Sequence, residues 1–531
     1  KMSVLDTACR RVLRMKFALG LFENPYTDEK RADTILRCPE HLATAEKIAE
    51  KSIVLLKNDG LLPLRKDLRS VAVIGPAADT VSYGDYTETR GRKGGVSVLD
   101  GIRAAVSPET EVLYERGCNF LGQALHPFDP SMLRDENGEA GLTGRYYNGP
   151  VPQGEPVQVR TDRTVNFNWI FALPHPELDA NCFSVAWTGS VIMPKTMDGC
   201  IGLSTQDSMR LYVDDKLLID GWGKDKSADQ ALDFHFEAGR TYKIRIEFVN
   251  DRRGARVIFG YSAGWENFPA AVEAARKADV AILCMGDNEE TSGENFDRTD
   301  LNLPGRQLEL VQAVYATGTP VVLVLQSGRP VTANWENDHL PAILEAWFPG
   351  EQGGTAIAKT LFGDAAPGGR LPITFPRSVG QIPCHYSRRP GGGKRYVEMD
   401  WLPLYPFGYG LTYTTFAYRD MALSRSVIDP QDTVTVSVTV TNTGKYTGDA
   451  VPQLYVRDMF SSVVKPERQL AAFRRLTLAP GESRRVELTV GPKQLRTLGP
   501  DYVWRVEPGK FELQLGDNAE NILLRADLTV E

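Results

Sequence analysis

Three short, uninterrupted apolar runs constrain this sequence more than any other feature. They occupy residues 71–76, 278–285, which is apolar throughout from residue 280, and 321–325. A strand that stays apolar at consecutive positions, instead of alternating, is typical of a parallel sheet covered on both faces. A helical apolar pattern at residues 307–316 separates the last two runs. We therefore expect an α/β sandwich around a parallel sheet, with a further strand at residues 52–58.

The long stretch between the first two runs has a different texture. From about residue 139 to residue 265, the expected strands alternate polar and apolar side chains and are rich in aromatic residues, as at 183–187 and 242–248. Such alternation predicts strands with one face in a core and one in solvent. Because α/β patterning flanks the stretch on both sides, we expect an all-β module, a barrel or a sandwich, inserted into a surface loop.

A third texture begins near residue 412. Residues 433–441 follow a strict period of two, and proline-glycine turns at 480–481 and 508–509 separate later strands, which predicts a β-sandwich. The expected fold class is multidomain, α/β plus all-β. Its expected parts are a helix and linker at 1–40, a discontinuous α/β domain at 41–138 and 266–388, the inserted module at 139–265, a connector at 389–411 and the β-sandwich at 412–531.

Charge and apolar patterning argue against several classes of partner. The formal net charge is −7 and basic residues occur singly or in pairs, so a nucleic-acid partner is not expected. No run approaches the roughly 18–20 apolar residues of a membrane span, so no membrane partner is expected either. The seven cysteines and six histidines are scattered without metal-ligand spacing, so neither a metal nor another cofactor is expected.

The densest cluster of charge lies directly after the second apolar run. Residues 286–298 contain one arginine and five carboxylates, which are Asp287, Glu289, Glu290, Glu294 and Asp297. Ligand-binding loops leave the carboxyl ends of strands in parallel sheets. A carboxylate among like charges also has the raised pKa that a general acid needs. From spacing alone three interpretations stay open: a solvated acidic loop, an acidic calcium loop or a catalytic loop.

Several segments, in order along the chain, resemble glycoside hydrolase family 3. Residues 292–298 (SGENFDR), followed by 300–307, are similar to the family's acid/base loop. Segments similar to its sheet domain and its fibronectin type III-like domain lie at 52–64, 349–354, 361–372, 406–413 and 466–470. The inserted module, at 141–147, 187–189 and 211–214, resembles the domain named after anthrax protective antigen.

The resemblance implies a retaining exo-β-glycosidase without a cofactor, most favourably a β-glucosidase acting on small β-glucosides or oligosaccharides. A β-xylosidase of the same family is the nearer alternative. A non-catalytic carbohydrate-binding or scaffold protein is the more distant one. Retention implies two carboxyl groups roughly 5–5.5 Å apart, of which one attacks the sugar and the other transfers the proton.

Catalytic roles carry over to the positions that match the family's loop. Glu294 matches the acid/base. Glu290 is the runner-up, because the loop varies in length within the family. Ser292 is expected to contact the substrate or to lie just behind the residues that do.

Other polar positions around the loop receive supporting roles. Asp297 and Arg298 are expected to form an ion pair that shapes the loop. Asp287 and Glu289 are expected to be exposed or structural. Residues 327–330, which follow the third apolar run, are either a plain turn or part of the same crevice.

The resemblance also implies a part that this sequence does not contain. In the family the nucleophile aspartate belongs to a (β/α)8 barrel, and residues 1–22 resemble the last helix of that barrel. We therefore expect no glycosidase activity from this chain alone, and activity once the barrel is supplied upstream or as a separate chain. By analogy, secretion or a periplasmic location is favoured and a homodimer is possible. The inserted module is expected to limit acceptance of long oligosaccharides.

Overall fold

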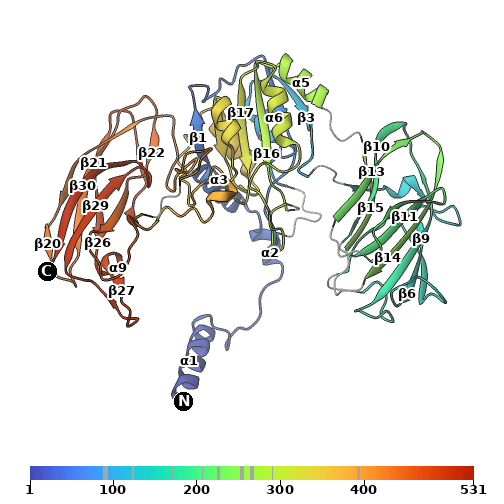
Figure 1. The fold of residues 1–531 in the computed structure, drawn as a ribbon, viewed down its shortest axis with the longest axis horizontal. Helices are drawn as coiled ribbons and strands as arrows, with labels where there is room; N and C mark the ends of the chain where they lie inside the picture. Colours follow the sequence, from blue (N-terminus) through green and yellow to red (C-terminus); the bar gives the residue numbers. More distant parts are fainter. Residues whose placement is uncertain are drawn as a thin grey trace.

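Three β-rich bodies lie in a row, with one helix set apart from them (Figure 1). This computed structural model describes residues 1–87, 94–121, 125–169, 173–205, 207–223, 228–250, 256–263, 268–289, 291–391 and 395–531. An α/β domain occupies the centre, the inserted module lies on one side of it and the C-terminal β-sandwich on the other. The two α/β segments on either side of the inserted module contribute strands to one sheet.

The central domain is built on a six-stranded sheet in the order β1-β18-β17-β16-β2-β3. The strands are β1 (Val54–Asn58), β2 (Ser70–Ile74), β3 (Glu111–Glu115), β16 (Val280–Gly286), β17 (Val321–Gln326) and β18 (Ala342–Glu345). All neighbours are parallel except β1, which is an antiparallel edge strand beside β18. The parallel sheet predicted from the three apolar runs is thus confirmed, and the strand expected at 52–58 forms its antiparallel edge.

Helices cover both faces of this sheet, as uninterrupted apolar strands require. Alternate side chains of β16 enter two different cores: Ile282 and Cys284 face one, Ala281 and Leu283 the other. The first core is covered by α3 (Pro39–Ser52), α4 (Val98–Ala105) and α8 (Gly353–Leu361), and the second by α5 (Phe268–Lys277), α6 (Gln307–Tyr315) and α7 (Asn334–His339). Burial on both faces explains why the strand sequences do not alternate.

The inserted module consists of two antiparallel sheets packed around an aromatic core that includes Trp187 and Phe248. One sheet contains β4 (His126–Pro127), β8 (Asn166–Asn168), β10 (Met197–Thr205), β13 (Ala228–Phe236) and β15 (Arg256–Ala263). The other contains β5 (Leu133–Arg134), β6 (Leu142–Asn148), β7 (Gln158–Asp162), β9 (Phe183–Ile192), β11 (Ser208–Val213), β12 (Lys216–Asp220) and β14 (Thr241–Asn250). Since β4 and β5 pair within these sheets, the module begins near residue 126 and not at 139. A short 3-10 helix, Pro130–Met132, links the two strands.

The C-terminal body is the expected β-sandwich. Its larger sheets join β19 (Phe416–Leu423), β21 (Val434–Asn442) and β26 (Ser483–Val490), and β20 (Val427–Ile428), β23 (Gln453–Asp458), β24 (Gln469–Phe473), β29 (Gly509–Gly516) and β30 (Ile522–Val530). Small pairs join β22 (Gly448–Ala450) with β25 (Leu476–Leu478), and β27 (Thr497–Leu498) with β28 (Trp504–Arg505), beside α9 (Pro492–Leu495). The period-two valines of β21 all enter the core, as predicted. A 3-10 helix, Val379–Gln381, precedes the connector.

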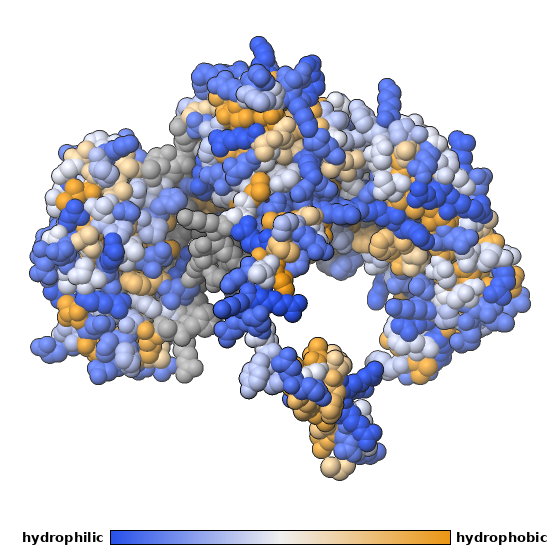
Figure 2. Space-filling model, turned by 180° about the vertical axis from the view of Figure 1, so that it is seen from behind, coloured by the Kyte–Doolittle hydropathy of each residue, from blue (hydrophilic) through white to orange (hydrophobic). Residues whose placement is uncertain are grey.

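The N-terminal helix α1 (Met2–Ala18) stands apart from the other elements (Figure 1). A thin segment with the short helix α2 (Arg31–Ile35) joins it to α3. None of its residues is buried, although Val4, Leu5 and Met15 are large and apolar. Figure 2 shows apolar residues gathered along this helix. No helix among the described residues is both long enough and apolar enough to cross a membrane.

Candidate active site

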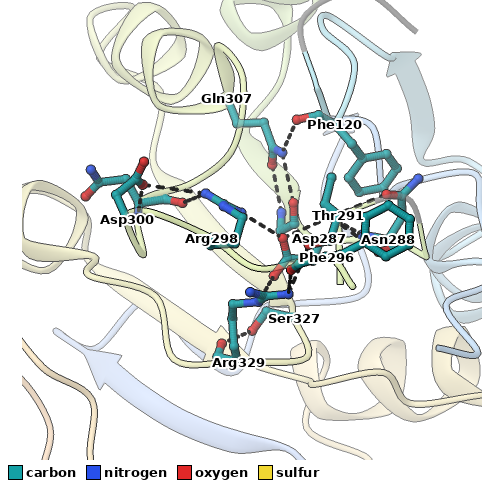
Figure 3. Close-up of polar contacts among 12 residues, drawn as sticks. Phe120, Asp287, Asn288, Thr291, Phe296, Arg298, Asp300, Gln307, Ser327 and Arg329 are labelled. Carbon is teal, nitrogen blue, oxygen red and sulfur yellow. Dashed lines mark hydrogen bonds and ion pairs between the residues drawn. The ribbon is translucent and has the colours of Figure 1, made fainter. Parts of the chain in front are cut away.

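The acidic loop leaves the carboxyl end of β16, between the ends of β2 and β17. The first residue of the loop has to be glycine. Gly286 has φ +134°, and an added Cβ would lie 2.0 Å from the carbonyl oxygen of Gln326. The buried side chain of Gln307, the first residue of α6, accepts a hydrogen bond from Gly286 N at 2.7 Å and donates to Gly286 O at 2.9 Å. The loop therefore starts from a rigid anchor (Figure 3).

Asp287 is the buried hub of the loop. Its side chain is 2 % exposed and lies between Arg298 and Arg329 (Figure 3). It accepts hydrogen bonds from Thr291 Oγ1 at 2.9 Å and from Arg298 Nη1 at 3.2 Å, and Arg329 Nε lies 3.7 Å from Oδ2. Burial raises the pKa of Asp287, whereas the Thr291 hydroxyl and the two guanidinium groups act in the opposite direction. Of the two expectations for Asp287, exposed or structural, exposure is wrong, because the residue is buried and paired.

Arg329 bridges the two limbs of the loop, which are the segments just before and just after Glu294. Its Nη2 donates to the carbonyl oxygens of Thr291 at 3.0 Å and Phe296 at 3.3 Å. Ser327, two residues earlier, donates its hydroxyl to Arg329 O at 2.9 Å. The segment 327–330 is therefore more than a plain turn, because Arg329 contacts the acidic loop on both sides of Glu294.

Glu294 lies at the exposed tip between those two limbs. Its backbone N–H donates to Asp85 Oδ2 at 3.0 Å, so a second segment of the α/β domain holds the tip. The next residue, Asn295, has φ +65°, a left-handed conformation that asparagine tolerates. Glu294 is thus an exposed residue on a turn whose backbone is anchored.

The remaining residues expected at the site divide into three groups. Ser292 is half-buried against Gly328, where an added Cβ would lie 2.4 Å from Ser292 Oγ. Asp297 is exposed. The ion pair expected between Asp297 and Arg298 is wrong: Arg298 pairs with Asp287 at 3.2 Å and with Asp300 at 3.5 Å. Neighbouring side chains in a turn diverge, so sequence adjacency was a poor guide to pairing.

Two further carboxylates complete the inventory of the loop. Glu290, the runner-up for the acid/base, lies outside the described residues. Glu289 is exposed and lines a cavity of about 370 Å³, together with Asp79, Tyr83 and Asp100. Among the residues that the structure describes, no group of three or more histidine, cysteine or carboxylate side chains is arranged to hold a metal ion.

Glu345, at the end of β18, is a buried carboxyl that the sequence interpretation missed. It is fully buried, lies 3.1 and 3.2 Å from Ser327 Oγ, and accepts a hydrogen bond from Trp347 N at 2.8 Å. Burial raises its pKa well above the usual value for glutamate. The available signal was a carboxyl that directly follows the apolar strand residues 342–344.

Similarity to known proteins extends over the whole chain. Residues 53–413 match the family model described as the glycosyl hydrolase family 3 C-terminal domain, and residues 450–519 match a fibronectin type III-like domain. A β-glucosidase of Rhizobium radiobacter is 33 % identical over all of this chain, a β-xylosidase of Formosa agariphila is 32 % identical over all of it, and a periplasmic β-glucosidase of Salmonella typhimurium is 30 % identical over 98 % of it. The chain spans 67 %, 56 % and 55 % of these three relatives.

Solved structures agree with this assignment. A β-glucosidase from Kluyveromyces marxianus in complex with glucose matches all of this chain, which covers 68 % of it, with 27 % identity and a TM-score of 0.75. A β-glucosidase from Erythrobacter marinus matches 99 % of this chain, which covers 55 % of it, with 30 % identity and a TM-score of 0.69. The family resemblance and fold class inferred from sequence motifs are therefore confirmed. The chain belongs to glycosyl hydrolase family 3.

Proposed function

We propose that this chain supplies the general acid/base and the accessory domains of a retaining exo-β-glycosidase. The favoured activity is that of a β-glucosidase, which releases terminal β-D-glucosyl residues from small glucosides or oligosaccharides. The observation that carries the proposal is Glu294, an exposed carboxylate on a turn anchored at both limbs beyond the carboxyl end of β16. Relatives named β-glucosidase that match the whole chain support the choice of sugar.

In the proposed mechanism Glu294 acts twice. Its protonated carboxyl first donates a proton to the glycosidic oxygen as the sugar–oxygen bond breaks and a nucleophile attacks the anomeric carbon. The resulting carboxylate then removes a proton from water, which releases the sugar from the covalent intermediate. Both steps require the Glu294 carboxyl to lie within hydrogen-bond distance of the reacting oxygen, so both depend on the anchoring of its turn.

The nucleophile in this proposal comes from outside the 531 residues. A carboxyl group on a barrel, supplied upstream or by a separate chain, would lie roughly 5–5.5 Å from Glu294 in a retaining enzyme. The curated relatives extend beyond the part that this chain matches, which leaves room for such a domain. We expect the isolated chain to show no turnover of aryl β-glucosides above that of buffer, and measurable turnover by the isolated chain would contradict this part of the proposal.

The acid/base assignment is tested in the protein completed by its barrel. Glu294→Ala should lower kcat/KM for an alkyl glucoside, which has a poor leaving group, by roughly 10²–10⁴-fold and spare 2,4-dinitrophenyl glucoside far more. With 2,4-dinitrophenyl glucoside, azide should raise the kcat of the variant by attacking the intermediate in place of activated water. Glu289→Ala, an exposed carboxylate on the same loop, is the matched control. If Glu290→Ala shows this signature and Glu294→Ala does not, the assignment moves to Glu290.

A β-xylosidase is the second candidate, because the relative from Formosa agariphila bears that name at 32 % identity. Turnover of matched aryl glucosides and xylosides by the barrel-complete protein separates the two. A non-catalytic scaffold predicts no turnover of either sugar. Secretion or a periplasmic location is supported by the periplasmic relative from Salmonella typhimurium and is tested by cell fractionation.

The inserted module is proposed to restrict chain length. Replacing residues 126–265 with a short linker should raise the relative kcat/KM for oligosaccharides over that for an aryl glucoside. The replaced segment begins at residue 126 because β4, which starts there, is the first strand that pairs within the module. An unchanged ratio, from a variant that retains aryl-glucoside activity, would make the module a spacer.

A further inference from the structure

We propose that Arg329 is a positioning residue for proton transfer, acting on Glu294 through the backbone of its loop. This inference rests on the proposed acid/base role of Glu294. Arg329 follows β17, whereas Glu294 follows β16, so one parallel strand end supports the loop of its neighbour. The catalytic tip would then owe its geometry to a side chain more than thirty positions away in sequence.

The contacts of Arg329 enclose Glu294. One nitrogen, Nη2, donates to Thr291 O and Phe296 O, three residues before and two residues after Glu294. Two carbonyl oxygens that share one cationic donor are held at a fixed separation. Without the donor the same oxygens would repel each other, and the turn between them would open.

Charge keeps Arg329 in this position. Arg329 Nε makes no hydrogen bond within the described part of the chain, and the Asp287 carboxylate lies 3.7 Å from it. Asp287 also pairs with Arg298, so one buried carboxylate faces two guanidinium groups. A buried anion of this kind strongly favours nearby cations, because the surrounding dielectric constant is low.

Side chains of neighbouring segments pack against the loop on both sides of Glu294. At Gly328 an added Cβ would lie 2.4 Å from Ser292 Oγ and 2.9 Å from the Phe348 ring. At Gly293 it would lie 2.5 Å from Asp85 Oδ2, on the segment that holds Glu294 N. The turn is therefore seated between two segments, and the arginine joins its limbs on the side of β17.

The geometry also explains why arginine is needed. A guanidinium group carries five N–H donors in a rigid plane, so it can bond two carbonyls while facing a carboxylate. A lysine ammonium is a single flexible point charge that cannot hold the same three partners in a plane. The structure thus assigns different outcomes to two substitutions at one position.

The experiment compares leaving groups in the protein completed by its barrel. Arg329→Ala should lower kcat/KM for an alkyl glucoside by roughly 10²-fold, the effect of about 1 Å of misplacement, and lower that for 2,4-dinitrophenyl glucoside only a few-fold. The kcat/KM of Arg329→Lys for the alkyl glucoside should fall between those of Arg329→Ala and the parent protein. Added guanidinium ion should partly restore the kcat/KM of Arg329→Ala. Lys277→Ala, which removes an exposed ion pair with Glu273 on α5, should change kcat/KM for neither substrate.

A second perturbation keeps the test independent of charge. Gly328→Ala leaves Arg329 in place but forces Ser292 to move, so it should give the same preference for the activated substrate. In the 531-residue chain, Arg329→Ala should also speed hydrogen exchange of the amides of residues 291–296 and leave those of β17 unchanged. Equal losses with both substrates, or unchanged exchange in the loop, would overturn the positioning role.

Failure of this inference can be told apart from failure of the proposed function. If Glu294→Gln lacks the leaving-group signature, the acid/base assignment is wrong and the positioning role falls with it. If Glu294→Gln has the signature and Arg329→Ala does not, the acid/base assignment stands and only the role of Arg329 is rejected.

Discussion

At the scale of single residues, the buried carboxyls of this protein are stabilised in two ways. Asp162, which is 5 % exposed, accepts hydrogen bonds from Tyr146 Oη at 2.6 Å, Trp187 Nε1 at 2.7 Å and Arg160 Nε at 2.7 Å. Glu336 on α7 is 3 % exposed, and burial raises its pKa to about 7. The first carboxyl is satisfied by three hydrogen-bond donors, whereas burial favours the protonated form of the second by raising its pKa.

Glu336 predicts a pH-dependent stability of the α/β domain. Its pKa is raised from 4.5 to about 7 in the folded state, so the folded chain binds the proton more tightly. The stability that this proton contributes is fully present below pH 4.5 and is lost as the pH rises through 7. Glu336→Gln removes this loss and should stabilise the domain at pH 8 relative to the parent by about 3 kcal/mol, with little difference near pH 4.5.

Denaturant unfolding at pH 5 and pH 8 checks this expectation. Glu309→Gln, at an exposed position on α6, is the control. A Glu336→Gln variant that is no more stable at pH 8 than the parent would show that the carboxyl is satisfied as an anion.

Asp162 predicts a cost that is confined to the inserted module. Asp162→Asn places an amide group against three donors, so at least one of them loses its acceptor. We expect the module to lose about 3 kcal/mol of unfolding free energy. Fluorescence of the buried Trp187 reports the transition, and Asp198→Asn, at an exposed position, should shift it little. Equal midpoints for the two variants would contradict the assigned role of Asp162.

At the scale of elements, two glycines decide how helices cross over the sheet. α4 and α8 pack so closely that a Cβ added at Gly101 would lie 2.2 Å from Gly354 O, and one at Gly354 would lie 1.9 Å from Ser97 O. Helix propensity alone favours alanine over glycine by about 1 kcal/mol. The obstacle is backbone on both sides, which cannot rotate away as a side chain can. Tertiary packing therefore reverses the local preference.

Gly101→Ala should accordingly destabilise the α/β domain by about 2 kcal/mol, in spite of the better helix propensity. Gly380→Ala is the matched control, because the nearest atom to its added Cβ is Ser378 Oγ at 3.6 Å. Thermal unfolding followed by circular dichroism measures both variants. Stabilisation by Gly101→Ala would mean that the two helices separate at little cost.

At the scale of the whole molecule, the described chain combines three well-packed bodies with a helix that packs on none of them. The α/β core, the inserted module and the β-sandwich each bury their own apolar cluster. Helix α1 contributes no buried residue to any of them. Isolated helices of this length are marginal in water, and none of the three bodies buries a residue of α1.

Removal of α1 tests this view. In the 531-residue chain, deletion of residues 1–30 should leave the thermal transitions of the three bodies within about 1 °C of the parent and lower only the helical signal. Differential scanning calorimetry and circular dichroism provide the two readings. A large fall in any transition would mean that α1 or its linker packs on one of the bodies in solution.

Local patterning anticipated most of the architecture. Uninterrupted apolar runs became β2, β16 and β17 because burial on both faces is read directly from consecutive residues. The alternating valines of β21 predicted a strand with one face in the core, because successive side chains point to opposite faces of a sheet. The early start of the inserted module was missed, since β4 and β5 have only two residues each and carry no periodicity.

The residues of the sequence by themselves determined the family, the three textures and the loop that carries Glu294. Only the tertiary structure decided which groups hold that loop. Arg298 pairs with Asp287, eleven positions earlier. Arg329, which follows β17, donates to the carbonyl oxygen of Thr291, which follows β16. Such pairings depend on which strand ends are neighbours in the sheet and on which carboxyl is buried. Composition and spacing record neither, because both arise only when the chain has folded.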